Sequence, residues 1–573
     1  MSTVAARSSE APPPTDRGRL DEAVVRVRAG ARTWALAPLR EKAALARALL
    51  AGAARNAERM VRAGCEAKGL SFDAPAAGDE WLAGVYPVLR MLRQLAESIE
   101  AVATRGNTPL GPLGEAVDGR TTARVFPSSG LDPLLFPFVR GEVHFLEGVG
   151  PREVDETRAR FHKHPGHDGR VCLVLGAGNV NSIAPADVAT KLFVEGKACV
   201  LKMNPVNAYA GPILEDAFAE AIRRGFLAIV YGGKDEGAYL AHHPGVDELH
   251  LTGSNATFDA IVWGPPGPDR EARMGRGEPL LTKEITSELG DVSPVLVAPG
   301  AWDDRTLTFQ AESVAGMMTQ NGSFNCLAAR VLVLPLGWRL RDRFLELLMR
   351  ALGTTAPRRP WYPGAVERLA RMVEGRSAVR AIAGADGTAP WTLVTGLDAA
   401  APDRAFTTEA FCSVLAETQV GSEDPVEFLE AAVTFANERL WGSLGAAILA
   451  PGPVVDDPVT GTALRRAVRQ LRYGTVAVNG FTGYGFALGT PPWGGFPGQP
   501  LRDPRSGRGF VHNTRMLEGV EKTVISHPPR LPVKPPYFPS HRTLHRLGPP
   551  LIALEARRDF LALPTVLVAA LRG

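Results

Sequence analysis

The eleven residues VCLVLGAGNVN (171–181) open the most regular part of this chain. Residues 171–175 are all apolar and predict a short buried strand, and a turn with two glycines separates them from a helical pattern at residues 184–195. The turn matches a dinucleotide-binding fingerprint only in part, because Asn181 stands where the third glycine would be. Asn179 follows the strand, where a side-chain amide either donates to an oxyanion or caps the next helix.

Apolar strands and helices keep alternating beyond this stretch. The further predicted strands are residues 198–203, 227–231 and 248–251, and the helices between them are residues 211–224 and 235–242. Strands that alternate with helices indicate a parallel sheet that is covered on both faces. Ligands bind such sheets beyond the carboxyl ends of the strands, so the loops that follow the strands are candidate binding loops.

A second alternation begins after residue 290. Its predicted strands are residues 294–297, 330–334, 414–416 and 446–449, and its predicted helices are residues 306–318, 339–352, 425–439 and 461–471. The simplest interpretation of the two alternations is an α/β protein with two lobes.

One cysteine, Cys326, lies between a polar turn and the apolar strand predicted at residues 330–334. A loop that leads into a core strand can hold a thiol rigidly at a cleft, where a nucleophile is useful. Taken alone, the pattern favours the simpler alternative of a buried core thiol, since unbonded cysteines are among the most buried residues. The choice between the two depends on the rest of the chain.

The composition is typical of a folded protein that does not span a membrane. Hydrophobic residues make up 45% of the chain and charged residues 22%, and no run approaches the roughly 20 apolar residues of a membrane-spanning helix. A net charge of +3 over 573 residues is too small to indicate a nucleic-acid partner. The five cysteines form no CxxC pair, which indicates free thiols in a reducing compartment. We therefore predict a cytoplasmic protein.

Three histidines, His162, His164 and His167, have the close spacing of metal ligands. Pro165 and Gly166 indicate that they lie in a loop, and the surroundings are not rich in carboxylates. A solvated histidine cluster is therefore the favoured interpretation, and we predict no metal site.

The segment 527–573 differs from the rest of the chain. It is rich in proline and in basic residues, and it ends in an apolar run, residues 560–571, that contains Pro564. Such a tail is compatible with peripheral contact with a membrane surface. Packing against the body of the protein or against a partner subunit is favoured, because Pro564 weakens an amphipathic helix.

Several short motifs follow one another in a fixed order. They are Asn179 with Lys202, Thr252-Gly253-Ser254, Glu288-Leu289-Gly290, Cys326-Leu327-Ala328, Glu409-Ala410-Phe411 and Pro492-Trp493-Gly494-Gly495. Their residue types and order resemble those of the aldehyde dehydrogenase superfamily over roughly residues 33–515. No single motif is convincing, but so many in one order would rarely arise by chance.

The resemblance implies catalytic roles for Cys326, Glu288 and Asn179. A Cys326 thiolate would add to an aldehyde carbon, and Asn179 with the backbone N–H of Cys326 would stabilise the resulting alkoxide. Hydride would then leave to the nicotinamide, and Glu288 would activate the water that hydrolyses the thioester. The reaction that the resemblance implies is NAD(P)-dependent oxidation of an aldehyde to a carboxylic acid.

The resemblance also implies a cofactor, NAD or NADP. The residues that would bind it are Lys202, Gly253, Ser254, Leu289, Glu409 and Phe411. After its lysine the family often has a carboxylate that holds the adenosine ribose, whereas Met203-Asn204-Pro205 offers none here. No charge at this position would repel a 2′-phosphate, so both cofactors stay open.

Two departures from the family pattern keep alternatives open. Ser323-Phe324-Asn325 stands where the family usually has Gly-Gln, and Asp291-Val292 replaces the usual Gly-Lys. One alternative is a coenzyme A-dependent acylating dehydrogenase or acyl reductase, against which Glu288 argues because acyl transfer can dispense with a hydrolytic base. The other is a non-catalytic nucleotide-binding relative, which would have no use for the three catalytic residues together.

The resemblance implies an aldehyde dehydrogenase-like α/β fold with a Rossmann-like nucleotide-binding lobe, a catalytic lobe and β arms. In the family such arms pair subunits, so a homo-dimer or homo-tetramer is expected. The predicted segments are a disordered tail (1–20), N-terminal helices and the NAD(P)-binding lobe (21–290) with a β arm near 122–150, the catalytic lobe (291–490), a return arm (491–526) and a Pro-rich basic tail (527–573).

Overall fold

The computed structural model describes residues 11–573, so residues 1–10 of the predicted tail lie outside the described residues. Helix α1 (Arg17–Ala35) begins inside the segment predicted to be disordered. Asp16 caps this helix, and its Oδ1 accepts a hydrogen bond from the backbone N–H of Arg19 at 3.0 Å. The prediction of disorder is therefore wrong for residues 17–20.

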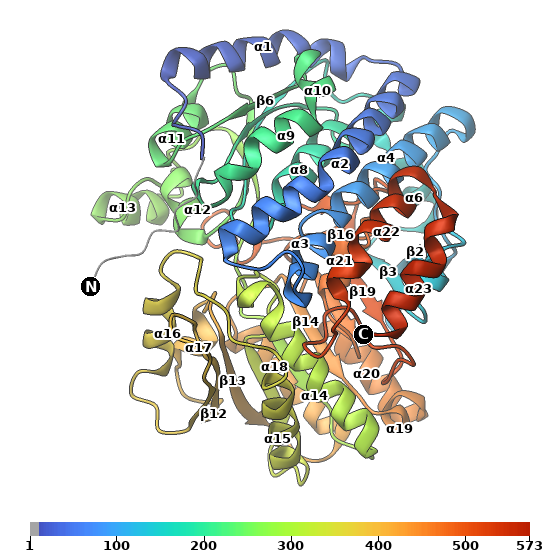
Figure 1. The fold of residues 1–573 in the computed structure, drawn as a ribbon, viewed down its shortest axis with the longest axis vertical. Helices are drawn as coiled ribbons and strands as arrows, with labels where there is room; N and C mark the ends of the chain where they lie inside the picture. Colours follow the sequence, from blue (N-terminus) through green and yellow to red (C-terminus); the bar gives the residue numbers. More distant parts are fainter. Residues whose placement is uncertain (1–10) are drawn as a thin grey trace.

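The N-terminal lobe is built on a six-stranded sheet in the order β17-β8-β7-β4-β5-β6 (Figure 1). Its strands are β4 (Val171–Leu175), β5 (Ala198–Lys202), β6 (Leu227–Val230), β7 (Glu248–Thr252), β8 (Glu284–Glu288) and β17 (Gly507–Arg508). All pair in parallel except β17, which is antiparallel to β8. Helix α1 packs on one face, and the long helices α2 (Leu39–Lys68) and α4 (Tyr86–Arg105) belong to the core on the other face.

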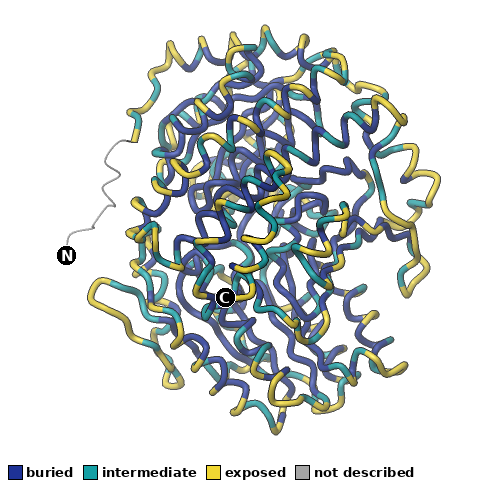
Figure 2. The backbone as a smooth tube through the Cα atoms, turned by 45° about the vertical axis from the view of Figure 1, so that its right-hand side comes forward, coloured by how far each residue is buried: buried dark blue, intermediate teal, exposed yellow. Residues whose placement is uncertain are grey.

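The catalytic lobe predicted after residue 290 is built on an eleven-stranded sheet in the order β1-β2-β3-β19-β15-β14-β9-β10-β13-β12-β11. Its central strands pair in parallel and are β9 (Pro294–Val297), β10 (Val331–Pro335), β12 (Trp391–Leu397), β13 (Val414–Val420), β14 (Gly445–Leu449), β15 (Thr475–Val478) and β19 (Val520–Ser526). The helices α14 (Asp304–Thr319) and α15 (Arg341–Leu352) cover one face, and α18 (Pro425–Arg439) and α20 (Pro458–Gln470) cover the other. Buried residues fill the middle of both lobes (Figure 2).

The predicted β arm near residues 122–150 and the last strand of the predicted return arm are part of this larger sheet. Strands β2 (Thr121–Phe126) and β3 (Arg140–Phe145) pair with each other, and β3 pairs antiparallel with β19. Strand β19 in turn lies parallel to β15. The arms therefore extend the sheet of this chain itself.

Most elements lie where the apolar pattern predicts them, with three kinds of difference. The helix predicted at residues 211–224 is broken at Phe218 into α9 (Gly211–Ala217) and α10 (Ala219–Arg223), and α8 (Ile183–Ala189) continues as a π-helical turn. Strand β8 is missing from the prediction because its sequence, EITSE, is mostly polar. Other elements beyond the prediction are α3 (Gly78–Leu82), α12 (Asn255–Val262), α13 (Pro268–Arg276), α16 (Ala365–Val373), β11 (Val379–Ile382), β12 and α21 (Gly483–Ala487).

The C-terminal tail is folded and packs against the body of the protein, which is the alternative that the sequence favours. It forms α22 (Leu544–Arg557), which packs against α3 and α4, and α23 (Leu563–Leu571), which packs against α22 (Figure 1). The expectation that Pro564 weakens the last helix is wrong, because Pro564 occupies the first turn of α23, where a missing N–H costs nothing. Within residues 11–573 no helix is long and apolar enough to cross a membrane.

Glu555 anchors the tail in a buried cluster of charges. Its carboxylate accepts hydrogen bonds from Tyr86 Oη at 2.9 Å, from Arg90 Nη1 at 2.8 Å and from Arg93 Nε at 2.6 Å. Arg90 also donates to Asp132 Oδ1 at 2.6 Å, so two carboxylates neutralise this guanidinium. Burial by itself disfavours a charged carboxylate, but Arg90 and Arg93 hold the pKa of Glu555 below its ordinary value.

We expect Glu555→Ala to lower the free energy of unfolding by about 3–5 kcal/mol, because it leaves buried guanidinium groups without a counter-charge. Urea unfolding followed by tryptophan fluorescence measures this loss. The matched control is Glu147→Ala, since Glu147 also pairs with an arginine but its side chain is 87% exposed. Equal effects of the two substitutions would contradict the assignment of Glu555 as an anchor.

Candidate active site

Cys326 lies in the loop between helix α14 and strand β10. The chain turns sharply there because Asn321 and Ser323 adopt positive φ angles of 53° and 72°. The guanidinium of Arg330 holds this turn, since Nη2 donates to the carbonyl oxygens of Ser323 at 2.7 Å and of Asn325 at 3.2 Å. The loop therefore presents a half-buried thiol at a fixed place in the wall of a cavity.

Glu288 ends strand β8 and meets the thiol directly. Cys326 Sγ donates to Glu288 Oε1 at 3.3 Å. Burial, with the nearby charge of Asp187, raises the pKa of Glu288 to about 7. Burial and the charge of Glu288 also raise the pKa of the Cys326 thiol well above its ordinary value, so the thiol keeps its proton until a base removes it.

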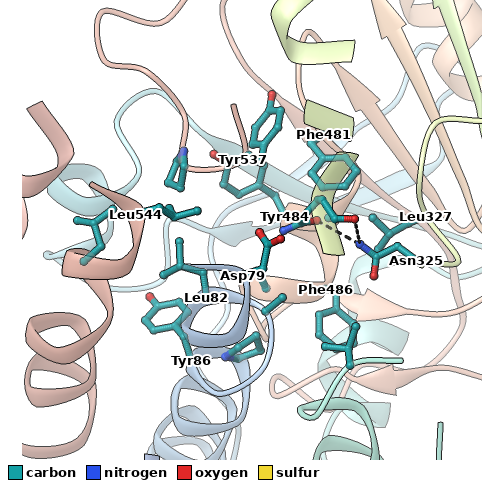
Figure 3. Close-up of a pocket in the computed structure, with 18 of the residues that line it drawn as sticks. Asp79, Leu82, Tyr86, Asn325, Leu327, Phe481, Tyr484, Phe486, Tyr537 and Leu544 are labelled. Atoms are coloured by element: carbon teal, nitrogen blue, oxygen red, sulfur yellow. Dashed lines mark hydrogen bonds between the residues drawn. The ribbon is translucent and has the colours of Figure 1, made fainter. Parts of the chain in front are cut away.

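Asn179 lies in the loop after β4 and is buried beside the cysteine loop. Its Nδ2 donates to the carbonyl oxygen of Phe324, two residues before Cys326, at 3.0 Å. The other side of Asn179 is also fixed, because Asn321 Nδ2 donates to its backbone oxygen at 3.0 Å. The structure thus brings all three predicted catalytic residues to one cavity. Figure 3 shows two neighbours of the cysteine in sequence, Asn325 and Leu327, in the wall of this cavity.

A buried lysine that the sequence analysis missed joins these loops. Lys68, at the end of α2, donates through Nζ to Glu80 Oε1 at 2.6 Å, to Asn321 Oδ1 at 2.9 Å and to the backbone oxygen of Asn179 at 3.3 Å. Asp79, the neighbour of Glu80, accepts from the backbone N–H of Asn321 at 2.9 Å. Nothing in the local pattern around Lys68 distinguishes it from a surface lysine in the last turn of a helix.

Three of the predicted cofactor residues lie at the carboxyl ends of β5 and β7. Lys202 is the last residue of β5, and burial lowers the pKa of its ammonium. Ser254 caps α12, and its Oγ accepts from the backbone N–H of Thr257 at 3.2 Å. The N–H of Gly253 donates to the backbone oxygen of Glu288 at 3.0 Å, which fixes this turn to the strand of the proposed base. A helix N-terminus and a lysine at one sheet edge suit an anionic ligand.

Leu289 offers less to a ligand than the sequence suggests. Its side chain is buried in the core of the N-terminal lobe, and its N–H already donates to the backbone oxygen of Ser506 at 2.8 Å. The role of Leu289 as a cofactor residue stays a prediction, and the structure shows this residue holding β8 to the segment that follows the catalytic lobe.

Glu409 and Phe411 lie in the loop before β13. The backbone N–H of Asp291 donates to Glu409 Oε1 at 3.3 Å, and burial raises the pKa of Glu409 to about 7. A Cβ atom added to Gly290 would come within 2.3 Å of Glu409 Oε2, so glycine is needed for this close approach. The ring of Phe411 packs at 4.8 Å between ring centroids against Tyr362. Glu409 therefore lies against the Glu-Leu-Gly motif.

Asp291 is a structural residue, although it interrupts the family pattern. Its carboxylate accepts from Ser293 Oγ at 2.7 Å, from Ser506 Oγ at 3.1 Å and from the backbone N–H of Gly445 at 3.1 Å. These bonds tie three segments together beside β9.

The predicted histidine cluster is only partly solvated. The ring nitrogens Nε2 of His162 and His167 lie 2.7 Å and 3.0 Å from the backbone oxygens of Phe193 and Glu195. The prediction of a solvated cluster is wrong for these two histidines, since both rings are half-buried against the main chain.

Parts of this chain are similar to known proteins. Residues 152–363 match the model of the aldehyde dehydrogenase family. The N-succinylglutamate 5-semialdehyde dehydrogenase of Ectopseudomonas mendocina is 25% identical over 273 residues, which cover 47% of this chain and 45% of that protein. The human 4-trimethylaminobutyraldehyde dehydrogenase is 26% identical over 181 residues, 31% of this chain and 33% of its own length. The chain thus spans less than half the length of these curated relatives.

Solved structures match over nearly the whole chain. The NADP-dependent glyceraldehyde-3-phosphate dehydrogenase of Bacillus halodurans, complexed with NADP, has a TM-score of 0.60 at 17% identity and covers 90% of this chain and 92% of that chain. An indole-3-acetaldehyde dehydrogenase complexed with NAD⁺ has a TM-score of 0.56 at 20% identity, with 90% of each chain covered. Residues 152–363 are thus similar to the aldehyde dehydrogenase family, and the chain as a whole shares the fold of these solved structures.

Proposed function

We propose that this chain oxidises an aldehyde to a carboxylic acid with NAD or NADP, through a covalent intermediate on Cys326. The observation that carries the proposal is the 3.3 Å contact between Cys326 Sγ and Glu288 Oε1, in a cavity that Asn179 also lines. A nucleophile, a base and an amide donor at one cavity form the set that acyl-transfer and aldehyde chemistry needs. The expected cytoplasmic location and homo-dimer or homo-tetramer belong to the same proposal.

The first step is a proton transfer from the thiol. Glu288 has a pKa of about 7, so a large fraction of its carboxylate is ionised at neutral pH and accepts the proton from Sγ. The thiolate then adds to the carbonyl carbon, and the carbonyl oxygen becomes an alkoxide. Asn179 Nδ2 and the backbone N–H of Cys326 are the donors proposed for this oxygen.

The bound NAD or NADP would supply the acceptor for the hydride that leaves the thiohemiacetal carbon. Lys202, Ser254 at the N-terminus of α12 and Glu409 are the side chains that would hold it, and their chemistry fits a ligand with phosphate and hydroxyl groups. Asn204 is uncharged and so adds no charge there. Its Oδ1 caps the next turn by accepting from the backbone N–H of Val206 at 3.0 Å.

Hydrolysis of the thioester completes the cycle. Glu288 first releases to solvent the proton that it took from the thiol, and then takes a proton from water as the water oxygen adds to the thioester carbon. The tetrahedral intermediate collapses to the acid, the C–S bond breaks, and the leaving thiolate of Cys326 recovers its proton from Glu288. Besides the thiol of Cys326, the side chain of Trp493 acts on the buried carboxyl of Glu288 and lowers its pKa against the larger effect of burial. A carboxyl with a pKa of about 7 beside the thiol supports hydrolysis over transfer of the acyl group to coenzyme A, because acyl transfer can dispense with a base.

We expect Cys326→Ala to abolish aldehyde-dependent formation of reduced nicotinamide, and Asn179→Ala to lower kcat/KM about 10²–10³-fold through the loss of one oxyanion donor. Absorbance of reduced nicotinamide, with NAD and NADP tested separately, measures both. Cys412→Ala is the matched control, because the Cys412 thiol is buried and has no proposed role. Full activity of Cys326→Ala would refute the covalent mechanism, and turnover that requires coenzyme A would favour the acylating alternative.

The pH dependence of kcat/KM is expected to follow the carboxyl of Glu288. Activity should rise through about pH 7, because Glu288 accepts protons only after losing its own. Glu288→Gln should remove this rise and lower kcat/KM about 10²–10⁴-fold. The control Glu278→Gln changes an exposed carboxylate that pairs with Arg276 and should leave the profile unchanged. A rise through pH 7 that persists in Glu288→Gln would assign the titration to another group.

A further inference from the structure

The C-terminal tail forms one wall of the cavity that leads to Cys326. The cavity measures about 160 Å³, and Cys326, Glu288 and Asn179 lie in its lining. Tail residues in the lining are Pro536, Tyr537, Leu544, Leu547, Leu551, Val566 and Ala570. Figure 3 shows Leu544 on the opposite side of the space from Asn325 and Leu327, and Tyr537 beside Phe481 and Tyr484. The tail therefore bounds the space that a substrate would occupy.

The walls away from the cysteine are apolar. Leu82, Phe136, Phe481 and Phe486 also line the cavity, and the lining holds only two charged side chains, Asp79 and Glu288, within the described residues. Further toward the tail, the polar atoms of two tyrosines are already engaged. Tyr86 Oη donates to Glu555, and Tyr537 Oη lies 2.9 Å from Ser313 Oγ.

The charge of Asp79 is compensated where it lies. Asp79 Oδ2 is 2.8 Å from Arg358 Nη2 and also accepts from the backbone N–H of Asn321. A carboxylate that already has a cationic partner and a backbone donor gives little attraction to a cationic substrate group. Away from Cys326 and Glu288, the lining therefore has no unpaired charge with which to recognise a charged substituent.

The tail packs closely against the body of the protein and so forms a fixed wall of the cavity. A Cβ atom on Gly548 of α22 would come within 2.2 Å of Trp81, and one on Gly78 would come within 2.2 Å of Leu544. On the other lobe, a Cβ atom on Gly316 of α14 would come within 2.4 Å of the backbone oxygen of Tyr537. Glycines in the tail and in the body allow this close approach, and the hydrogen bonds of Glu555 anchor α22.

We propose that the tail, residues 536–570, is the specificity-determining wall of the substrate site and selects aldehydes that carry an uncharged apolar group. This inference rests on the proposed function. An apolar cavity of about 150 Å³ is large enough to hold benzene, so a phenyl ring or a chain of about six carbons suits the present space. Such pockets bind apolar groups by contact and exclude charged groups for which they offer no counter-charge or hydrogen-bond partner.

The test compares two substitutions on the same helix. Val566→Phe fills the cavity from α23, whereas Val568→Phe adds the same ring at a position that is 46% exposed and outside the lining. We expect Val566→Phe to lower kcat/KM for hexanal and benzaldehyde at least tenfold and for acetaldehyde less than twofold. Val568→Phe should change none of these values.

Substrate comparison with the unmodified protein gives a second arm. Hexanal and benzaldehyde should exceed succinic semialdehyde and betaine aldehyde in kcat/KM by at least tenfold. A preference for either charged aldehyde would overturn the proposal, and so would equal effects of Val566→Phe on acetaldehyde and hexanal. Circular dichroism checks the fold, and Val566→Ala provides a variant that enlarges the cavity and should shift the optimum toward longer aldehydes.

Binding without turnover separates this inference from the proposed function. Saturation-transfer NMR with benzyl alcohol detects occupancy of the cavity in the Cys326→Ala protein. Binding that persists in Val568→Phe and is lost in Val566→Phe supports the tail wall even if no aldehyde is oxidised. If the protein oxidises aldehydes and the benzyl alcohol signal is the same with and without Val566→Phe, the tail does not form the wall of the substrate site. The proposed function then still stands.

Discussion

The geometry of the proposed active site depends on one buried cation, the ammonium of Lys68. It donates to the backbone oxygen of Asn179, which belongs to the N-terminal lobe, and to the side chain of Asn321, which belongs to the cysteine loop. Glu80 neutralises its charge at 2.6 Å. Removal of one partner from such a buried pair costs about 3–5 kcal/mol, so the arrangement resists change. The amide donor and the cysteine loop are thus held at one separation by a residue that touches neither sulfur nor substrate.

Burial also sets the protonation states of the site. The low polarity around Glu288 raises the pKa of its carboxyl to about 7 and raises the pKa of the Cys326 thiol as well. Both groups therefore favour their neutral forms, and a thiolate forms chiefly when the neighbouring carboxylate takes the proton. The 3.3 Å contact provides that route, so the same desolvation that protects the thiol makes it dependent on Glu288.

The sequence predicts what depends on local pattern and on motif order. The two alternations of apolar strands with helices and the positions of Asn179, Glu288 and Cys326 all follow from short stretches of sequence. Contacts between residues that are far apart in the sequence produce no such local pattern. Lys68 bonds to Asn321, 253 positions further along the chain, and no local pattern marks either residue for the other.

The tail shows that a proline-rich segment can still form helices. Pro549 and Pro550 lie inside α22, where each lacks the N–H of a helical hydrogen bond. Packing against the body outweighs this loss, since Leu544, Leu547 and Leu551 are all buried. Tertiary burial of this kind is set by α3 and α4, whose sequences lie more than four hundred residues earlier, so the tail sequence favours packing but does not show which elements it packs against.

The anchor of the tail also determines the polarity of the cavity. Tyr86 lines the cavity and would present a hydroxyl to any ligand, but Glu555 of the tail accepts the hydrogen bond of that hydroxyl. The ring of Tyr86 is then left as an apolar surface. Glu555 belongs to the same helix as Leu547 and Leu551. This helix therefore supplies apolar side chains to the cavity and also binds the hydroxyl of Tyr86, so that this hydroxyl is not free to bind a ligand. Apolar character in this cavity is therefore a joint property of the tail and the helix on which it lies.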